Sequence, residues 1–216
     1  MKPVKPAKLN RGDLIGIIAP ASAPTSEEKI IKAAEYLERC GYRVKLGKNV
    51  RAVRGYLAGS DAQRASDIND MFADKQVRGV IAVRGGYGTP RLLPLVDYRL
   101  IKRNPKIFVG YSDLTALQLA LYKATGLVTF SGPMAAVEMF KEIDPFTEEH
   151  FWRMVTSERA EGVVRNPDSR PLKAIGTGKA RGILLGGNLS LIASMAGTPY
   201  LPSFKNSILF LANLIK

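Results

Sequence analysis

The chain has 216 residues, of which 46% are hydrophobic, and its formal net charge is +13. This apolar content is enough for a packed core and excludes a wholly disordered chain. The longest apolar runs, LIGIIAPA and ILFLANLI, are shorter than the ~20 residues that span a bilayer. No signal-peptide pattern follows the basic start, so we expect a cytoplasmic protein with no membrane partner.

The charge and the cysteine content bear on partners and cofactors. Basic residues are spread along the chain, without a run of five, a zinc-finger spacing or an RNA-binding aromatic motif. Charge alone therefore does not predict nucleic-acid binding. The single cysteine, Cys40, excludes an intramolecular disulfide and a multi-cysteine metal site. We expect no nucleic acid, no metal and no cofactor.

Apolar runs alternate with amphipathic segments over most of residues 1–158. The runs that have the pattern of strands, mostly buried on both faces, are 13–22, 42–47, 77–86, 105–112 and 127–134. The segments with a helical pattern are 26–41, 60–74, 89–104 with an interruption at Pro94, 113–126 and 144–158. This alternation predicts an α/β fold with a doubly wound, mostly parallel sheet and helices on both faces.

The composition changes after residue 158. Gly, Pro, Asn and Asp are frequent in 159–180, which indicates a linker. A glycine-rich stretch, an apolar helix and a closing apolar strand, SILFLANLIK, follow within 181–216. We interpret 1–158 as an α/β domain and 181–216 as the beginning of a second, smaller C-terminal domain.

Three loops that follow predicted strands are candidates for a site: APASAP, RGGYGTPR and GYSD. Ligands of doubly wound sheets bind at the carboxyl ends of the strands, where such loops gather. The adjacent glycines of RGGYG would let backbone N–H groups face a ligand without obstruction by a Cβ atom. Further along, Asn188 in GGNLS could cap the next helix or hold a substrate carboxylate.

Ser112 stands between a predicted strand and a predicted helix in FVGYSDLTAL. Gly110 supplies half of a nucleophile-elbow pattern, but Leu114 occupies the place of the second glycine. Serine is also a favoured helix N-cap, and the local pattern favours that role. The one histidine, His150, lies in TEEHFWRM, a context typical of a surface residue.

Four motifs then occur in order: AVRGGYGTPRLLPLVDY, FVGYSDLTALQLALY, FSGPM and GILLGGNLSLIASMAGTPYLPSFKNSILFL. Together they resemble the LD-carboxypeptidase family of serine peptidases, which includes the microcin C immunity proteins, over nearly the whole chain. The resemblance implies that Ser112 is the nucleophile and that the backbone N–H groups of Asp113 and Gly86 stabilise the oxyanion. The residues that we expect to bind substrate are Gly85, Tyr87 and Asn188.

The resemblance also implies a reaction. In cell-wall recycling, such a peptidase would release a C-terminal D-amino acid, such as D-alanine, from a murein tetrapeptide through a seryl acyl-enzyme, without a metal. One alternative is cleavage of an aminoacyl-nucleotide antibiotic, as in the immunity proteins. Another is a murein-peptide binder without catalytic activity.

The chain departs from the family pattern at the triad. Ala212 in LFLAN stands where the family has the glutamate of LFLED, and the family's histidine would lie beyond Lys216. His150 does not match that histidine, and Ser131 of FSGPM stands where histidine or another residue is common. We therefore expect the chain alone, whether truncated, split or degenerate, to be weakly active or inactive.

Two structural expectations follow. Ser112 should lie at the carboxyl end of a central parallel strand, in a cleft shared with the RGGYG loop. Residues 208–215 form a strongly apolar segment that should be buried, at least partly by a partner. That partner would be a second copy in a homodimer or a separate chain that carries the rest of the C-terminal domain.

Overall fold

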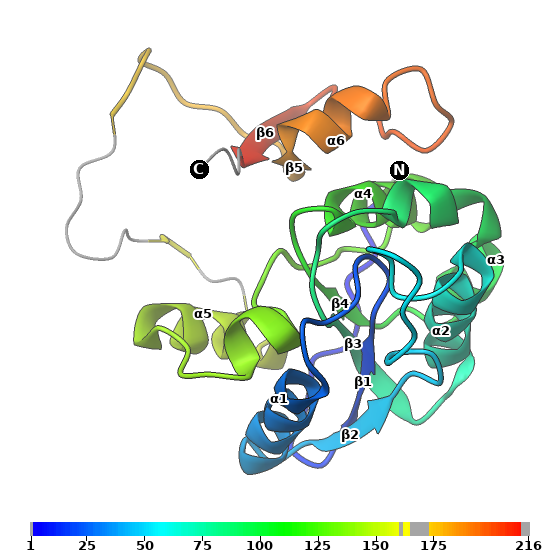
Figure 1. Ribbon diagram of the computed structural model, residues 1–216. Coiled ribbons are helices and arrows are strands. Elements are labelled where there is room, and N and C mark those ends of the chain that lie inside the picture. Colours follow the sequence, from blue (N-terminus) through cyan, green and yellow to red (C-terminus); the bar gives the residue numbers. More distant parts are fainter. Residues whose placement is uncertain (1, 160–161, 165–172, 213–216) are drawn as a thin grey trace.

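The computed structural model describes residues 2–159, 162–164 and 173–212 (Figure 1). Its main sheet has four parallel strands in the order β2-β1-β3-β4, which confirms the predicted α/β class. The strands are β1 (Leu14–Ile18), β2 (Arg43–Leu46), β3 (Val77–Ala82) and β4 (Ile107–Val109). The helices of this part are α1 (Glu27–Arg39), α2 (Asp61–Ala73), the 3-10 helix η1 (Thr89–Leu95), α3 (Tyr98–Arg103), α4 (Leu114–Thr125), the π-helix η2 (Ala135–Met139) and α5 (Pro145–Thr156).

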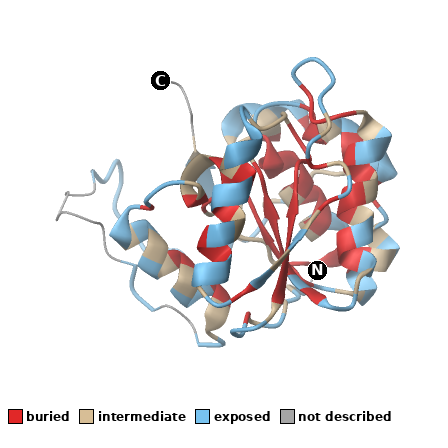
Figure 2. Ribbon diagram, turned by 60° about the horizontal axis from the view of Figure 1, so that its bottom comes forward, coloured by how far each residue is buried: buried red, intermediate tan, exposed pale blue. Residues whose placement is uncertain are grey.

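Side chains along the strands alternate between two hydrophobic cores. In β1, Ile15 and Ile17 pack in the core that includes α1, η2 and α5. Leu14 and Ile18 pack in the other core, with α2, α3 and α4. Figure 2 shows the buried strands between these two layers of helices. Strands β1 and β4 are apolar and buried throughout because both of their faces are covered, whereas the edge strand β2 exposes Arg43 and Lys45.

The predicted strand 127–134 is not a regular strand. It pairs with β4 only through an isolated bridge, in which the Phe130 N–H donates to the Phe108 carbonyl and the Gly110 N–H donates to the Phe130 carbonyl. Pro133 has no N–H with which to continue the ladder. As a result β4 is the outer strand of the regular sheet, and the expectation that it is central is wrong.

The strands are also shorter than the apolar runs that predicted them. Residues 19–22 and 110–112 leave the sheet after β1 and β4 and form loops at its carboxyl edge. The runs continue past the strand ends because these loops are themselves partly buried, with Ala19 and Ala21 among the core residues. The segment 89–104 is interrupted, as expected, but not at Pro94: Pro94 lies inside the 3-10 helix η1, and the break falls at Val96 and Asp97, before α3.

The C-terminal segment forms a second, two-stranded parallel sheet. Its elements are β5 (Ile183–Asn188), α6 (Leu189–Ser194) and β6 (Ser207–Ala212), which lie beside α4 (Figure 1). The sequence analysis missed β5, because glycines lower the strand propensity of ILLGGN. In the fold the glycine is required: Gly186 has φ +153, and a Cβ there would overlap the carbonyl of Phe210 on β6.

This chain by itself does not bury β6. The side chains of Ile208, Leu209, Phe210 and Leu211 are between 41% and 54% exposed. Residues 213–215, which belonged to the same expectation, lie outside the described residues. Burial of β6 by a partner stays a prediction. No helix among the described residues is both long and apolar enough to cross a membrane.

Candidate functional site

Three loops meet at the carboxyl edge of the main sheet. Because β1, β3 and β4 are parallel, the loops that follow them leave the sheet on the same side. Gly85, after β3, lies against the turn after β4: a Cβ built on it would be 3.3 Å from the Oγ of Ser112. Ser22, after β1, accepts a hydrogen bond from the Tyr87 N–H at 3.2 Å. The expected proximity of Ser112 to the RGGYG loop is therefore confirmed.

Ser112 has the backbone of a strained turn. Its φ is 64°, in the left-handed region that L-residues other than Asn and Asp rarely adopt. The N-cap of α4 is Asp113, and no side chain caps this helix. The Ser112 carbonyl accepts from the Thr115 N–H at 3.0 Å, while its Oγ has no hydrogen bond to any described residue. The N-cap role that the local pattern favoured is wrong, and the strand-turn-helix geometry is that of a nucleophile elbow.

Asp113 is a buried carboxylate directly after this serine. Only 3% of it is exposed, and its Oδ2 accepts the Thr89 N–H at 2.9 Å. The Thr89 hydroxyl in turn donates to the Asp113 backbone carbonyl. Burial raises the pKa of Asp113, and the hydrogen bonds from Thr89 lower it in part. The backbone N–H of Asp113 makes no hydrogen bond with the described residues.

The RGGYG loop requires glycine at its third position, Gly86. Gly86 has φ +123, and a Cβ there would overlap the Oγ of Ser22. Its backbone can therefore approach a ligand more closely than that of any other residue type. The neighbouring Tyr87 is 56% exposed and lies edge-on to Tyr56, with ring centroids 5.5 Å apart. The two tyrosines form an aromatic rim beside Gly86.

Asn188 ends β5 beside the first turn of α4. Its N–H donates to the hydroxyl of Thr115 at 3.0 Å, which ties the small sheet to the helix that follows Ser112. Its side-chain oxygen accepts the Leu191 N–H at 3.1 Å, so the predicted cap role is confirmed. The side-chain amide nitrogen has no hydrogen bond to a described residue. A role for it in substrate binding stays a prediction.

In the part of the chain that the structure describes, no imidazole or carboxylate side chain is hydrogen-bonded to Ser112. Ala212 pairs with Asn188 at the carboxyl end of β6, so the position of the family's glutamate holds a methyl group. His150 lies on α5, where its Nδ1 is 2.8 Å from the Phe146 carbonyl and its ring stacks on Phe146. No described hydrogen bond joins His150 to Ser112. Among the described residues, no cluster of His, Cys, Asp and Glu has the makings of a metal site.

The structure adds three polar side chains that the sequence analysis did not single out. They are Ser22, Thr89 and Thr115: the first two bond to the backbone of another loop of the site, and Thr115 bonds to the backbone of Asn188 at the end of β5. Because they lie in or next to APAS, RGGYG and GYSD, the sequence indicated the segments that contain them. Which hydroxyl bridges which loop depends on tertiary contacts that no local pattern contains.

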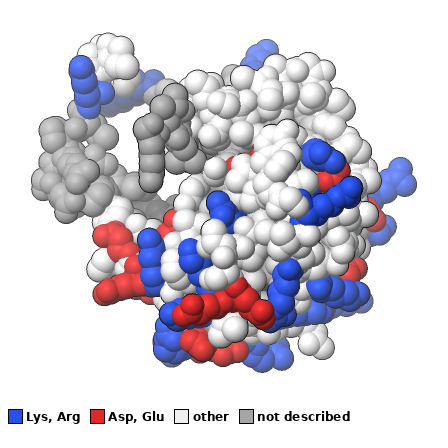
Figure 3. Space-filling view, in the orientation of Figure 1, with Lys and Arg blue, Asp and Glu red and all other residues white. Residues whose placement is uncertain are grey.

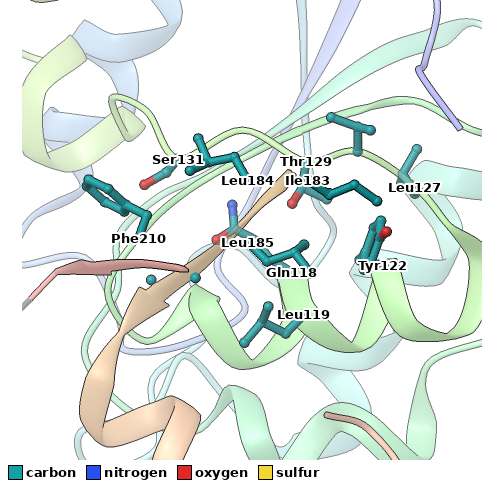
Figure 4. A pocket seen from close by; sticks show the side chains of 13 residues that line it. Gln118, Leu119, Tyr122, Leu127, Thr129, Ser131, Ile183, Leu184, Leu185 and Phe210 are labelled. Carbon is teal, nitrogen blue, oxygen red and sulfur yellow. The ribbon is translucent and has the colours of Figure 1, made fainter. Parts of the chain in front are cut away.

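A pocket of about 180 Å³ lies between α4 and the small sheet (Figure 4). Gln118 and Tyr122 line it from α4, and Phe210 lines it from β6. Ser131, the position where histidine is common in the family, also faces it. Ser112 does not line this pocket, so we assign it to the contact between the two sheets and not to the candidate site.

Comparison with known proteins identifies a family for both parts of the chain. Residues 15–132 match the LD-carboxypeptidase N-terminal domain, and residues 181–215 match the LD-carboxypeptidase C-terminal domain. The chain is 40% identical to a probable murein peptide carboxypeptidase of Bacillus subtilis, over 97% of this chain and 65% of that protein. It is 32% identical to the microcin C7 self-immunity protein MccF of Escherichia coli, over 97% of this chain and 69% of that protein.

Solved structures give the same result. An MccF-like protein from Bacillus anthracis superposes with a TM-score of 0.87 at 32% identity, covering 97% of this chain and 70% of that one. A muramoyltetrapeptide carboxypeptidase from Oxalobacter formigenes superposes with a TM-score of 0.77 at 34% identity, covering 92% and 65%. The chain thus spans roughly two thirds of the length of the proteins it matches.

Proposed function

Because the chain belongs to the LD-carboxypeptidase family, we propose that it acts as a serine carboxypeptidase on murein peptides, with Ser112 as the nucleophile. One observation carries this proposal. Ser112 has a left-handed backbone at a strand-turn-helix elbow, and its Oγ is unbonded beside Gly85. A serine that only capped a helix would not need this strained geometry, which costs of order 1–3 kcal/mol.

The proposed reaction is acyl transfer. The Oγ of Ser112 attacks the carbonyl carbon that precedes the C-terminal D-amino acid, and a C–O bond forms. The N–H groups of Gly86 and Asp113 hold the resulting oxyanion, aided by the positive end of α4. The C–N bond then breaks, the leaving amine takes up a proton, and the D-amino acid departs. Water hydrolyses the seryl ester in a second step.

Attack by Ser112 needs an acceptor for the hydroxyl proton. The described residues place neither an imidazole nor a carboxylate in hydrogen-bond contact with its Oγ, and Ala212 stands at the glutamate position. Loss of triad members costs about 10⁴-fold in rate in serine peptidases. We therefore expect this chain alone to turn over an L,D-tetrapeptide slowly.

The other parts of the proposal concern substrate and surroundings. Tyr87 and Asn188, together with Gly85, would bind the peptide. We divide the chain into an α/β domain (1–158), a linker (159–180) and a C-terminal part (181–216). We place the protein in the cytoplasm, as part of cell-wall recycling, and propose that a homodimer or a second chain covers β6.

The nucleophile is tested with a serine-directed peptide phosphonate. We expect slow formation of one covalent adduct, located on Ser112 by mass spectrometry of the digested protein. Ser112→Ala should abolish the adduct. Ser131→Ala is the matched control, since Ser131 is a serine that directly follows Phe130, the residue bridged to β4. This variant should leave labelling of Ser112 unchanged. An adduct elsewhere, or none after prolonged incubation, would refute Ser112 as the nucleophile.

Two competing functions predict different results in labelling, binding and substrate comparison. A binder without catalytic activity would show saturable calorimetric binding of the tetrapeptide but no adduct on Ser112. An antibiotic-cleaving protein would prefer an aminoacyl sulfamoyl nucleotide to the tetrapeptide. This second possibility is supported by the MccF structure in complex with aspartyl sulfamoyl adenosine, which superposes on this chain with a TM-score of 0.84.

A further inference from the structure

The nucleophile turn is anchored on both sides of Ser112. On one side, the hydroxyl of Tyr111 donates to Glu138 at 2.7 Å. On the other side, the Asp113 carboxylate accepts the Thr89 N–H at 2.9 Å. A left-handed serine persists only where the surrounding structure holds it, and these two contacts flank it directly. Of the two, only the Asp113 contact reaches the RGGYG loop.

Asp113 and Thr89 are joined twice. The carboxylate accepts the Thr89 N–H, and the Thr89 hydroxyl donates to the Asp113 backbone carbonyl. Thr89 has no exposed surface, and Asp113 is almost fully buried. Hydrogen bonds to a charged acceptor in a buried site are stronger than those between neutral groups at the surface. The loop and the turn are therefore held together as one unit.

A buried arginine, Arg64, contacts this unit. The side chain of Arg64 has no exposed surface and donates to the Pro20 carbonyl, in the loop after β1, at 2.7 Å. Gly88 rests on it, since a Cβ there would lie 2.7 Å from Nη1. Its positive charge favours the ionised form of Asp113. One residue of each loop of the site (Pro20, Gly88 and Asp113) thus interacts with the buried Arg64.

We propose that the Asp113 carboxylate is a positioning residue that sets the spacing between the backbone N–H groups of Gly86 and Asp113. This inference rests on the proposed function, in which these two groups hold the oxyanion. It assigns the side chain a role separate from that of its own N–H. Arg64 and Thr89 act through Asp113 and the loop and need not touch the substrate.

The expected effect follows from the geometry of an oxyanion site. Its donors act only when they lie within about 0.3 Å of hydrogen-bond distance from the developing anion, and removal of one donor costs about 10²–10³-fold. A displacement of about 1 Å costs on the order of 10²-fold. Loosening the Asp113 contact should therefore weaken binding of a tetrahedral anion and leave binding of the uncharged ground state nearly unchanged.

The test uses the full chain and two ligands. The first is a murein-peptide boronic acid whose boron stands at the scissile carbonyl: Ser112 Oγ adds to boron, its proton passes to water, and an anionic tetrahedral boronate remains. The second is the same peptide with a carboxamide. For Asp113→Asn we expect boronate affinity to fall about 10- to 100-fold and carboxamide affinity to stay within about twofold.

Asp67→Asn is the matched control. Asp67 is also 3% exposed and also accepts a loop backbone N–H, that of Asn49 at 3.0 Å, but Asn49 follows β2 and belongs to none of the three loops of the site. Both ligands should bind this variant as they bind the wild type. The inference would be overturned if Asp113→Asn lost affinity equally for both ligands, or if its boronate affinity were unchanged.

A second pair of variants guards against misfolding. Thr89→Val removes only the hydroxyl and should lower boronate affinity about tenfold, whereas Thr89→Ser keeps the donor and should restore it. If Asp113→Asn does not fold, the boronate affinities of Thr89→Val and Thr89→Ser test the proposal in its place. Equal boronate affinities of these two variants would count against it. Absence of a boronate adduct in the wild type would instead refute the nucleophile, and the positioning role with it.

Discussion

Strands β4 and β6 are both short runs of large apolar residues, and they differ completely in burial. Phe108 of β4 has no exposed surface, whereas Phe210 of β6 is 54% exposed. The first strand has helices on both of its faces, while β6 pairs with β5 and leaves much of its surface open. An apolar strand sequence therefore indicates that the strand needs to be packed against other elements. Whether it is packed depends on which elements lie beside it in the fold.

The surface charge differs between the same two regions. In Figure 3 lysine, arginine, aspartate and glutamate side chains gather over the α/β part, and the surface over β5, α6 and β6 is mostly uncharged. Exposed apolar surface without charge is typical of an interaction site. The comparison supports the proposal that a partner covers the small sheet.

The largest expected effect is loss of the small sheet alone. In Gly186→Ala the new Cβ would overlap the Phe210 carbonyl, so β5 and β6 must separate. We expect hydrogen exchange of β6 to lose its protection while β1 and β3 stay protected, because the two sheets share no strand pairing. Gly178→Ala is the control, since Gly178 has a similar φ of +152 with nothing within 4 Å. Equal loss of protection in both variants would show that backbone strain, and not the overlap, breaks the sheet.

The next effect separates the two phenylalanines. Phe108→Ala should lower the free energy of unfolding by about 3–5 kcal/mol, because it leaves a cavity in a closed core. Phe210→Ala should cost less than about 1 kcal/mol in a monomer. Urea denaturation at several protein concentrations measures both. A large, concentration-dependent cost for Phe210→Ala would show that a second copy buries β6.

The smallest effect concerns a buried charge of the α/β part. Lys106 is 6% exposed and donates to the carbonyls of Met71 and Asp74, and burial lowers its pKa from 10.5 to about 8. Between these values the unfolded chain binds more protons, so the stability of the wild type relative to Lys106→Met should rise with pH. The rise from pH 8 to 10.5 should be at most about 3 kcal/mol.

Urea denaturation at each pH measures this difference. Tyrosines that titrate in the same range are present in both proteins, so their contribution cancels. Lys48→Gln, which removes an exposed lysine paired with Asp70, is the control and should give a flat difference. A flat difference for Lys106→Met as well would mean that Lys106 keeps an ordinary pKa in the folded chain.

The sequence by itself determined the α/β layers and the edge where the site lies. Strands buried on both faces are apolar at every position, and the helices between them have one apolar face, so a local pattern carries this information. The motifs around Gly85 and Ser112 also predicted that their loops lie side by side, because parallel strands bring the loops that follow them to one edge.

Only the tertiary structure decided what the side chains do there. The pattern around Ser112 suits a cap as well as a nucleophile, and the structure excludes the cap, since Asp113 is the N-cap of α4 and Ser112 has a φ of 64°. The bonds of Asp113 to Thr89 join residues that are 24 positions apart in the chain, so no local spacing reveals them. Burial of β6 depends equally on what lies against it. These properties arise from contacts between distant segments, and the fold alone brings such segments together.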